Sequence, residues 1–132
     1  MDQRTILIAD DQTHMRFLLR ASLAPLGCRI LSAGSGEEAL ATAASTPIDL
    51  FLTDFEMPGL SGVQTAQRLK AIPQYADLPI ILITARGQKR IRDEAALAGV
   101  TLVLTKPFSP SELLETLQRL LANTEGAVAA RG

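Results

Sequence analysis

Reactive side chains follow the ends of four short apolar runs in this chain. The run ILIADD ends on Asp10 and Asp11, LFLTD on Asp54, IILIT on Thr84, and LVLTK on Lys106. If these runs are parallel strands of one sheet, their carboxyl ends lie on the same edge and the side chains share a crevice. Three carboxylates, a hydroxyl group and an ammonium group would then form a single site.

The chemistry of such a crevice follows from its charges. The carboxylates of Asp10 and Asp11 repel each other, and Asp54 would add to the repulsion unless a cation neutralises it. Oxygen ligands at this density suit Mg²⁺, which binds one or two protein carboxylates, keeps several waters and shares a phosphate. Lys106 could pair first with a carboxylate and then with phosphate oxygens. The alternative is that each residue only ends a strand or begins a loop.

The apolar pattern predicts the elements that would position these side chains. Short β-rich runs lie near residues 5–9, 28–32, 49–53, 79–83 and 101–104, and segments with helical spacing separate them. Right-handed crossovers between parallel strands place helices on both faces of the sheet, which explains why the third and fourth runs are apolar almost throughout. The pattern predicts an α/β, doubly wound fold with a five-stranded parallel sheet.

Local signals mark where the helices begin and end. Ser35, Ser61 and Ser109 are each followed three residues later by Glu or Gln, which is the spacing of a capping box. Gly27 and Gly99 suit helix ends before the second and fifth strands. These signals support the alternation of strands and helices.

Length and composition narrow the class of protein. A chain of 132 residues fits one domain, which we expect over residues 1–122, with residues 123–132 as a flexible tail and no room for an effector domain. A net charge of -1 gives no reason to expect nucleic-acid or membrane attraction. The single cysteine, Cys28, excludes an internal disulfide and is expected to pack in the core. No apolar stretch is long enough to span a bilayer, so we expect a cytoplasmic protein without membrane insertion.

The motifs IADD, TDFEMPGLSG, ITA and TKPF, in this order, resemble those of the receiver domain of two-component response regulators. The resemblance extends from about Thr5 to Leu121. It implies a flavodoxin-like (βα)5 fold with strand order 2-1-3-4-5. It also implies phosphorelay signal transduction by a stand-alone, chemotaxis-regulator-like response regulator.

The resemblance also implies roles at the site. Asp54 would be the phosphoacceptor, attacking the phosphorus of a phosphohistidine. Asp11 would bind Mg²⁺ directly and Asp10 mainly through water, and Asp54 and the backbone carbonyl of Glu56 would complete the protein ligands.

The remaining implied roles concern the last two strand ends. Lys106 would pair with the phosphoryl oxygens, and the peptide bond between Lys106 and Pro107 would be cis. Thr84 would move to hydrogen-bond the new aspartyl phosphate and draw the following loop with it.

The implied partners are a sensor histidine kinase or a histidine phosphotransfer protein, and a downstream protein target. We expect a phosphoacceptor that promotes its own phosphorylation and slow dephosphorylation, not a turnover enzyme. The output surface would span the fourth helix, the fifth strand and the fifth helix, and the same surface could form a homodimer. Arg86, Lys89, Arg90 and Arg92 form a basic cluster, but no groove-reading helix accompanies it, so we expect no DNA binding.

Two positions bear on switching. Val103 stands where receivers that switch through an aromatic side chain often have Tyr or Phe, so switching would depend on Thr84, on backbone movement, or on Phe108 unless that ring is core. Glu56 and Arg86, each two residues beyond a site residue, carry opposite charges. They could form a gate-like ion pair over the crevice or be two independently solvated side chains.

Parts of the sequence also fit three other functions. Gly34, Gly36 and Ala39 match a dinucleotide-binding fingerprint, but the acidic residues that follow would oppose a pyrophosphate. A Mg²⁺-dependent phosphohydrolase with an aspartate nucleophile, resembling the haloacid dehalogenase family, would need a second aspartate where this chain has Gln12. A receiver-like binding module that is never phosphorylated would not need Asp54 and its partner residues.

Overall fold

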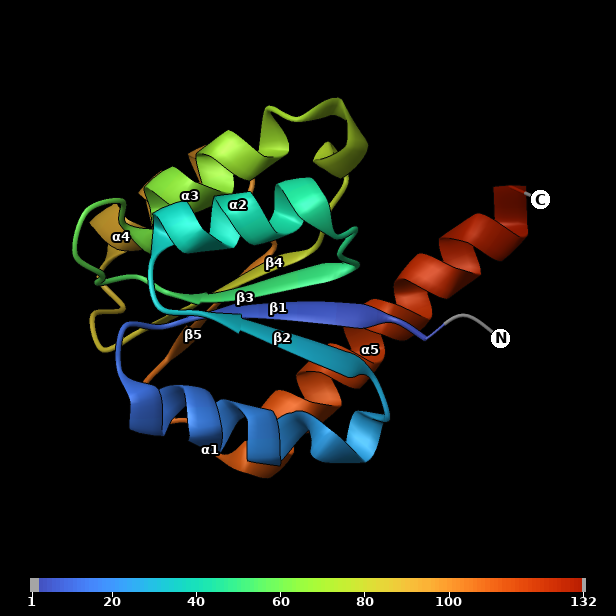
Figure 1. Cartoon of the computed structure of the whole chain (residues 1–132), viewed down its shortest axis with the longest axis horizontal. Coiled ribbons are helices and arrows are strands. Elements are labelled where there is room, and N and C mark those ends of the chain that lie inside the picture. Colours follow the sequence, from blue (N-terminus) through green and yellow to red (C-terminus); the bar gives the residue numbers. More distant parts are fainter. Residues whose placement is uncertain (1–2, 132) are drawn as a thin grey trace.

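The computed structural model describes residues 3–131, with side chains described for residues 3–122. Five parallel strands form one sheet in the order β2-β1-β3-β4-β5. Helices α1 and α5 cover one face of the sheet, and α2, α3 and α4 cover the other (Figure 1). The predicted doubly wound α/β fold and its strand order are confirmed.

The strands are four or five residues long. Their bounds are β1 Thr5–Ala9, β2 Arg29–Ala33, β3 Leu50–Asp54, β4 Ile80–Thr84 and β5 Leu102–Thr105. The first matches its prediction, and the other four begin and end one residue later than predicted. An apolar run marks where side chains are buried, whereas a strand is bounded by its ladder of backbone hydrogen bonds, so the two differ at their ends.

Five α-helices connect or follow the strands in the described part of the chain. Their bounds are α1 Thr13–Leu23, α2 Gly36–Ser45, α3 Gly62–Lys70, α4 Lys89–Leu97 and α5 Pro110–Arg131. Two short 3₁₀ turns, η1 Ala24–Leu26 and η2 Pro73–Tyr75, lie between helices and strands. The backbone of α5 stays helical past residue 122, so it gives no boundary for the predicted tail, whose flexibility stays a prediction.

The predicted serine caps begin their helices as expected. The hydroxyl oxygens of Ser35, Ser61 and Ser109 each accept a hydrogen bond from the backbone N–H three residues later. At Ser61 the box closes, because the side chain of Gln64 accepts from the Ser61 N–H at 2.9 Å. At Ser35 the reciprocal bond is shifted by one residue, because Glu38 accepts from the backbone N–H of Gly34 at 3.0 Å. Both arrangements satisfy backbone donors that the first helical turn leaves free.

Two glycines provide the turns that follow helices. Gly27 has φ 70° and ends η1, and Gly99 has φ 86° just after α4. This left-handed region is open to glycine without the steric cost that other residues carry. The chain can therefore reverse sharply into β2 and β5, as the sequence predicted.

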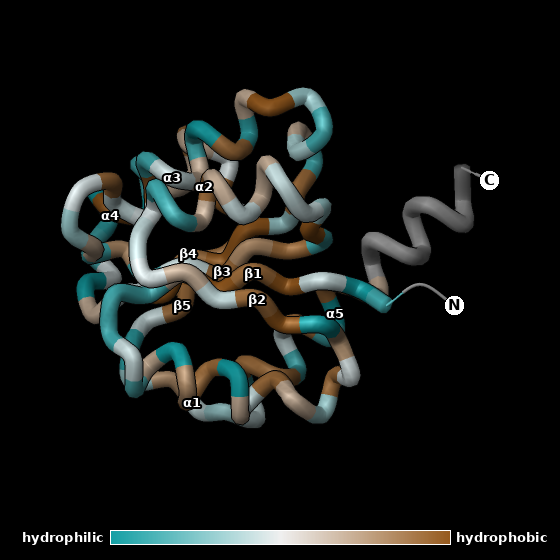
Figure 2. Tube along the Cα trace, viewed as in Figure 1, coloured by the Kyte–Doolittle hydropathy of each residue, from teal (hydrophilic) through white to brown (hydrophobic). Residues whose placement is uncertain are grey.

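The core lies on both faces of the sheet. Alternate residues of the central strands face opposite sides: Ile6, Ile8, Leu50 and Leu52 pack with α1 and α5, and Leu7, Ala9 and Phe51 pack with α2 and α3. Figure 2 shows these strands as the most hydrophobic part of the trace. Because both faces are covered, β1 and β4 are buried along their whole length.

Cys28 is partly buried and packs against the α1 and α5 side of the core, as predicted. Within the described residues, none of the helices has the length and apolar character needed to cross a membrane.

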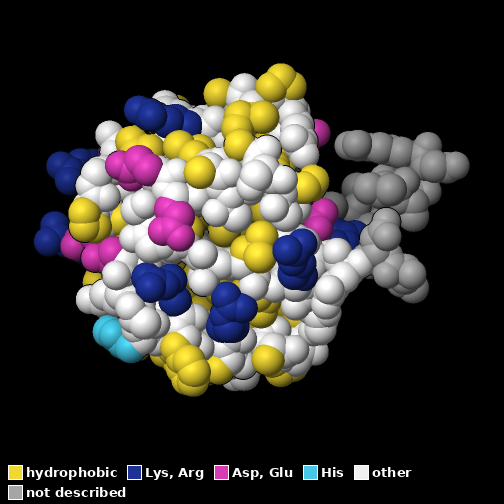
Figure 3. Space-filling model, in the orientation of Figure 1, with side chains coloured by type: hydrophobic (Ala, Val, Ile, Leu, Met, Phe, Trp, Pro, Cys, Tyr) yellow, Lys and Arg dark blue, Asp and Glu magenta, His cyan; other side chains and the backbone are white. Residues whose placement is uncertain are grey.

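On the face shown in Figure 3, positive and negative side chains are interspersed over the helices. His14 is exposed near the start of α1.

Candidate functional site

The strand register sets the relative heights of the polar residues. Asp54 pairs with Ile83, so Thr84 lies one residue farther along its strand. Thr84 pairs in turn with Thr105, so Lys106 lies two residues beyond the level of Asp54. A side chain as long as lysine is therefore needed to reach back to the carboxylate of Asp54.

The three aspartates meet at the carboxyl edge of the sheet. One oxygen from each of Asp10, Asp11 and Asp54 can be chosen so that all lie within 4.8 Å of one another. Asp10 is 2% exposed and accepts a hydrogen bond from the N–H of Gln12 at 2.9 Å, whereas Asp11 is exposed. This oxygen-only donor set, open on one side, fits a hard divalent cation that keeps several waters.

The carboxylates of Asp10 and Asp54 lie in surroundings that disfavour their charged form. Burial raises the pKa of both groups above 3.8 because it removes water from the charged form. Lys106 lowers the pKa of Asp54, and the neighbouring Asp10 raises it further. The crevice therefore carries more negative charge than its own lysine balances.

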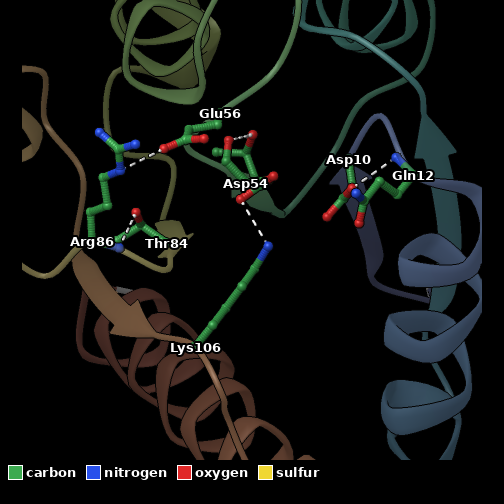
Figure 4. A network of polar contacts seen from close by, with 8 residues as sticks. Asp10, Gln12, Asp54, Glu56, Thr84, Arg86 and Lys106 are labelled. Carbon is green, nitrogen blue, oxygen red and sulfur yellow. Dashed lines mark hydrogen bonds and ion pairs between the residues drawn. The ribbon is translucent and has the colours of Figure 1, made fainter.

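Lys106 is the cation inside the crevice. Its Nζ lies 3.2 Å from Oδ1 of Asp54, and the two side chains are 27% and 11% exposed. Figure 4 shows the lysine side chain reaching from the end of β5 to the end of β3. The peptide bond that joins Lys106 to Pro107 is cis, as the resemblance implied.

Thr84 is buried at the end of β4, with 1% of its surface exposed. Its Oγ1 accepts a hydrogen bond from the backbone N–H of Arg86 at 3.0 Å. The hydroxyl proton remains free to donate to another acceptor. Thr84 lines the same crevice as Asp54 and Lys106, so the structure brings the predicted strand ends together.

The crevice has a volume of about 570 Å³ and is open to solvent. Besides the site residues, its walls come from the segment after Asp54 and from the first residues of the loops after β1 and β4. These lining residues are Gln12, Phe55, Glu56, Met57, Pro58, Ser61 and Ala85. The small side chain of Ala85 leaves the crevice unobstructed beside Thr84.

Glu56 and Arg86 form the ion pair that the sequence left open. Arg86 Nε lies 3.1 Å from Glu56 Oε1, and the side chains are 62% and 59% exposed. The alternative of two independently solvated side chains is wrong for this structure. The pair joins the loop after β3 to the loop after β4 (Figure 4).

Two supporting residues escaped the sequence interpretation. Arg16, on α1, donates from Nη1 to the backbone carbonyl of Asp10 at 2.7 Å and so braces the end of β1. Gly62, the first residue of α3, lies so close to the backbone carbonyl of Asp54 that a Cβ would collide with it. Arg16 had no signal in the sequence, and the glycine had one only in the PGLSG segment.

The packing around Val103 bears on how a change at the site would spread. Val103 and Phe55 are partly buried against the same cluster, which includes Ile91 and Ala95 of α4. Phe55 directly follows Asp54, so an aromatic ring is present here on the loop of the site instead of on β5. Phe108 packs partly buried on the opposite side of the sheet, in line with the core interpretation.

The dinucleotide fingerprint does not form a binding site. Gly36 is buried against Thr65 of α3 and Leu60, so its backbone contacts protein where a pyrophosphate would need space. The Glu37 carboxylate lies 2.5 Å from the position of a Cβ at Gly59, beside the loop. These contacts and charges leave no cradle for a phosphate at this helix start.

Comparisons with known proteins agree with this geometry. The family model for the response regulator receiver domain matches residues 6–118. The phosphate regulon transcriptional regulatory protein PhoB of Pseudomonas aeruginosa is 36% identical over 92% of this chain, which spans only 53% of that relative. A chemotaxis protein CheY homolog of Campylobacter jejuni is 33% identical over 95% of this chain and 98% of its own.

A solved receiver domain has the same fold. The receiver domain of the sensor histidine kinase PA1611 from Pseudomonas aeruginosa, solved with a magnesium ion coordinated in its active site cleft, is 30% identical, with a TM-score of 0.81. The likeness covers 89% of this chain and 97% of that one. The fold, the arrangement of strand ends and the family match lead to one conclusion: this chain belongs to the family of response regulator receiver domains.

Proposed function

We propose that Asp54 is the phosphoacceptor of this receiver domain and takes its phosphoryl group from a phosphohistidine. The observation that carries the proposal is the 3.2 Å contact between Lys106 Nζ and Asp54 Oδ1 inside an acidic crevice. An aspartate oxygen attacks the phosphorus, an acyl phosphate bond forms, and the histidine nitrogen leaves with the electron pair of the broken bond. Lys106 then offsets negative charge on the phosphoryl oxygens.

The carboxylates of Asp10, Asp11 and Asp54 would hold Mg²⁺ together with the backbone carbonyl of Glu56. When bound, the ion would neutralise charge on the phosphoryl oxygens and on the crowded carboxylates. Support comes from the spacing of the three carboxylates and from the raised pKa values of Asp10 and Asp54, which mark a need for positive charge. Asp10 would act mainly through water, as the resemblance to receiver domains implies.

Thr84 would respond to phosphorylation of Asp54. Its hydroxyl already accepts a hydrogen bond from the Arg86 N–H, so it keeps one proton to donate to a phosphoryl oxygen on Asp54. Movement of Thr84 toward that oxygen would pull on the loop that follows β4. The loop begins the output surface that we assign to α4, β5 and α5.

We assign this protein a sensor kinase or histidine phosphotransfer protein as donor and a downstream protein as target, in the cytoplasm. The output surface has two exposed leucines, Leu97 at 89% and Leu102 at 38%, which a protein partner or a second copy could cover. Helix α5 adds little to it, because Leu113, Leu117 and Leu121 are buried in the core.

The protein would be modified stoichiometrically and would not turn over a substrate. A Mg²⁺-dependent phosphohydrolase would instead release many phosphates per chain, and an unphosphorylated binding module would take up none. Incubation with acetyl phosphate and Mg²⁺, followed by mass spectrometry and borohydride trapping of the acyl phosphate, separates the three functions. We expect one phosphoryl group per chain, on Asp54.

Asp54→Asn should take up no label at the site. The matched control is Asp49→Asn, directly before the start of β3, which should label normally. Multiple turnovers of a small phosphate ester would establish the hydrolase instead. No label on the wild-type chain from acetyl phosphate or from phosphohistidine donors would overturn the proposed function.

A further inference from the structure

The loops on either side of the crevice are joined by a side-chain contact. Glu56 lines the crevice two residues after Asp54, and Arg86 lies two residues after Thr84. Their 3.1 Å ion pair connects positions 30 residues apart in the chain. In Figure 4 this contact lies between the loop after β3 and the loop after β4, close to Asp54.

Arg86 has a second contact, which links the Glu56–Arg86 ion pair to Thr84. Its backbone N–H donates to the hydroxyl oxygen of Thr84 at 3.0 Å, while its side chain binds Glu56. One residue therefore positions the buried hydroxyl group and is itself fixed by the loop next to the phosphoacceptor. A displacement of the Arg86 backbone would change both contacts together.

The same loop is tied to α4 on its other side. Arg92 donates from Nε to the backbone carbonyl of Gly87 at 3.1 Å. The segment 85–88 is thus held by Glu56 at the crevice and by Arg92 at the helix. Release at the crevice would leave this segment attached to α4, which is the first element of the proposed output surface.

The position of the Glu56–Arg86 ion pair is more important than its contribution to stability. Exposed ion pairs contribute little to stability, and both of these side chains are more than half exposed. A weak contact suits a device that must open, because the arriving phosphoryl group brings negative charge that repels Glu56 and attracts Arg86. The guanidinium group can bind phosphoryl oxygens with two donors at once.

We propose that the Glu56–Arg86 pair is a latch across the crevice mouth that holds Thr84 and the loop after β4 in the unphosphorylated arrangement and releases Arg86 to the phosphoryl group when it opens. The proposal rests on the proposed function of Asp54 as phosphoacceptor. It makes Glu56 and Arg86 positioning residues that set how readily the domain is phosphorylated.

The first experiment uses the unphosphorylated protein, so it does not depend on the function of Asp54. Hydrogen exchange of the Arg86 amide, measured by NMR, reports opening of its bond to Thr84. Glu56→Gln and Arg86→Gln should each speed this exchange about two- to fivefold, the range that the loss of an exposed ion pair allows. The double variant should match the single variants, because a latch can be broken only once.

The control is a second exposed ion pair outside the crevice, between Lys89 Nζ and Asp93 Oδ2 at 2.8 Å on α4. Asp93→Asn removes a carboxylate from a pair of similar exposure and should leave the Arg86 amide unchanged. Strictly additive effects of Glu56→Gln and Arg86→Gln, or an equal effect of Asp93→Asn, would overturn the latch.

The second experiment measures phosphorylation by acetyl phosphate with Mg²⁺. Glu56→Gln should raise the rate constant about two- to fivefold, because Arg86 is free and one negative charge is gone. Arg86→Gln should lower it, because the unpaired Glu56 then faces an anionic donor. A Glu56→Gln rate equal to that of Asp93→Asn refutes the latch, whereas an unlabelled wild-type chain refutes the function of Asp54 and leaves the exchange result standing.

Discussion

Lys106 Nζ lies 3.2 Å from Asp54 Oδ1, although its backbone is two residues beyond the level of that aspartate in the sheet. The pair is mostly shielded from solvent, with 27% and 11% of the side chains exposed. In the crevice this contact favours the ionised form of Asp54, which burial disfavours. An aspartate that must act as a nucleophile needs that form.

Replacement of Lys106 by alanine should slow phosphorylation of Asp54 about a hundredfold, a loss typical of removing one charge-stabilising donor from an active site. The pKa of Asp54 should also rise, because Lys106 is the strongest influence that lowers it. Rates with acetyl phosphate and Mg²⁺, followed by phosphate-affinity gel electrophoresis, measure the first effect. Lys89→Ala on the exposed side of α4 is the control, and a rate for Lys106→Ala within a factor of about two of that control would contradict the role given to this lysine.

Asp10→Asn should stabilise the metal-free protein at neutral pH. Burial raises the pKa of Asp10 above 3.8, so the folded chain binds its proton more tightly than the unfolded chain does. Stability therefore falls as pH rises from 3.8 through the raised pKa, and above that value the full cost of the buried charge is present. Asparagine keeps the acceptor for the Gln12 N–H without the charge, so we expect a gain of about 1 kcal/mol at pH 7, or roughly 4 °C in Tm for a chain of this length.

The gain from Asp10→Asn should shrink as pH approaches 3.8, where the aspartate is protonated in both states. Thermal unfolding followed by circular dichroism at several pH values in EDTA measures it. Asp93→Asn, which neutralises an exposed carboxylate on α4, supplies the baseline. A gain for Asp10→Asn that is independent of pH would show that its charge is not the cause.

Mg²⁺ should raise the Tm of the wild-type protein relative to EDTA. A ligand that binds only the folded state at ten times its Kd adds about 1.4 kcal/mol. Asp11→Asn should lose most of this stabilisation, because Asp11 is the proposed direct ligand, whereas Asp77→Asn, far along the chain in an exposed turn, should keep it. Equal stabilisation of Asp11→Asn and wild type would exclude Asp11 from the metal site.

Gly62→Ala should damage the site more than a glycine substitution normally damages a helix start. A Cβ at Gly62 would collide with the backbone carbonyl of Asp54 and lie 2.9 Å from Cδ1 of Leu82, so Asp54 would have to move. We expect a loss of stability of about 1 to 3 kcal/mol, in the range for overpacked sites, together with slower phosphorylation.

Gly34→Ala is the matched control, because a Cβ there would meet only side-chain atoms at 3.4 Å or more. Urea unfolding and the acetyl phosphate reaction give the two readouts. If Gly62→Ala behaves like Gly34→Ala in both, then close approach of α3 to Asp54 is not required.

The sequence predicted the site correctly where the position of a side chain follows from the direction of its strand. Parallel strands bring their carboxyl ends to one edge, so buried apolar runs that end on Asp10, Asp54 and Thr84 predicted a shared crevice without any knowledge of distances. The capping serines likewise predicted the helix starts, because their bonds join residues close in the chain. The one-residue shift of four strands does not alter the site, since the strands concerned still end on Asp54 and Thr84 or directly before Lys106.

The sequence was silent where a contact depends on the rotamer of a long or exposed side chain. The Glu56–Arg86 pair had two equally good interpretations, because charge alone does not say where flexible side chains point. Arg16 looked like an ordinary helix-surface residue, yet its guanidinium group binds the carbonyl of Asp10. Gly62 is small for a reason that only the packing of α3 against β3 reveals.

The position of Lys106 has a consequence for how the domain loses activity. β5 is one of the two edge strands of the sheet; among the described residues it pairs only with β4, and both of its terminal residues are exposed. The carboxylates lie at the ends of β1 and β3, which are interior strands, whereas the lysine follows this edge strand. Local unfolding that detaches β5 would therefore remove the positive charge and leave the acidic residues in place, so partially unfolded molecules would be inactive before the core has melted.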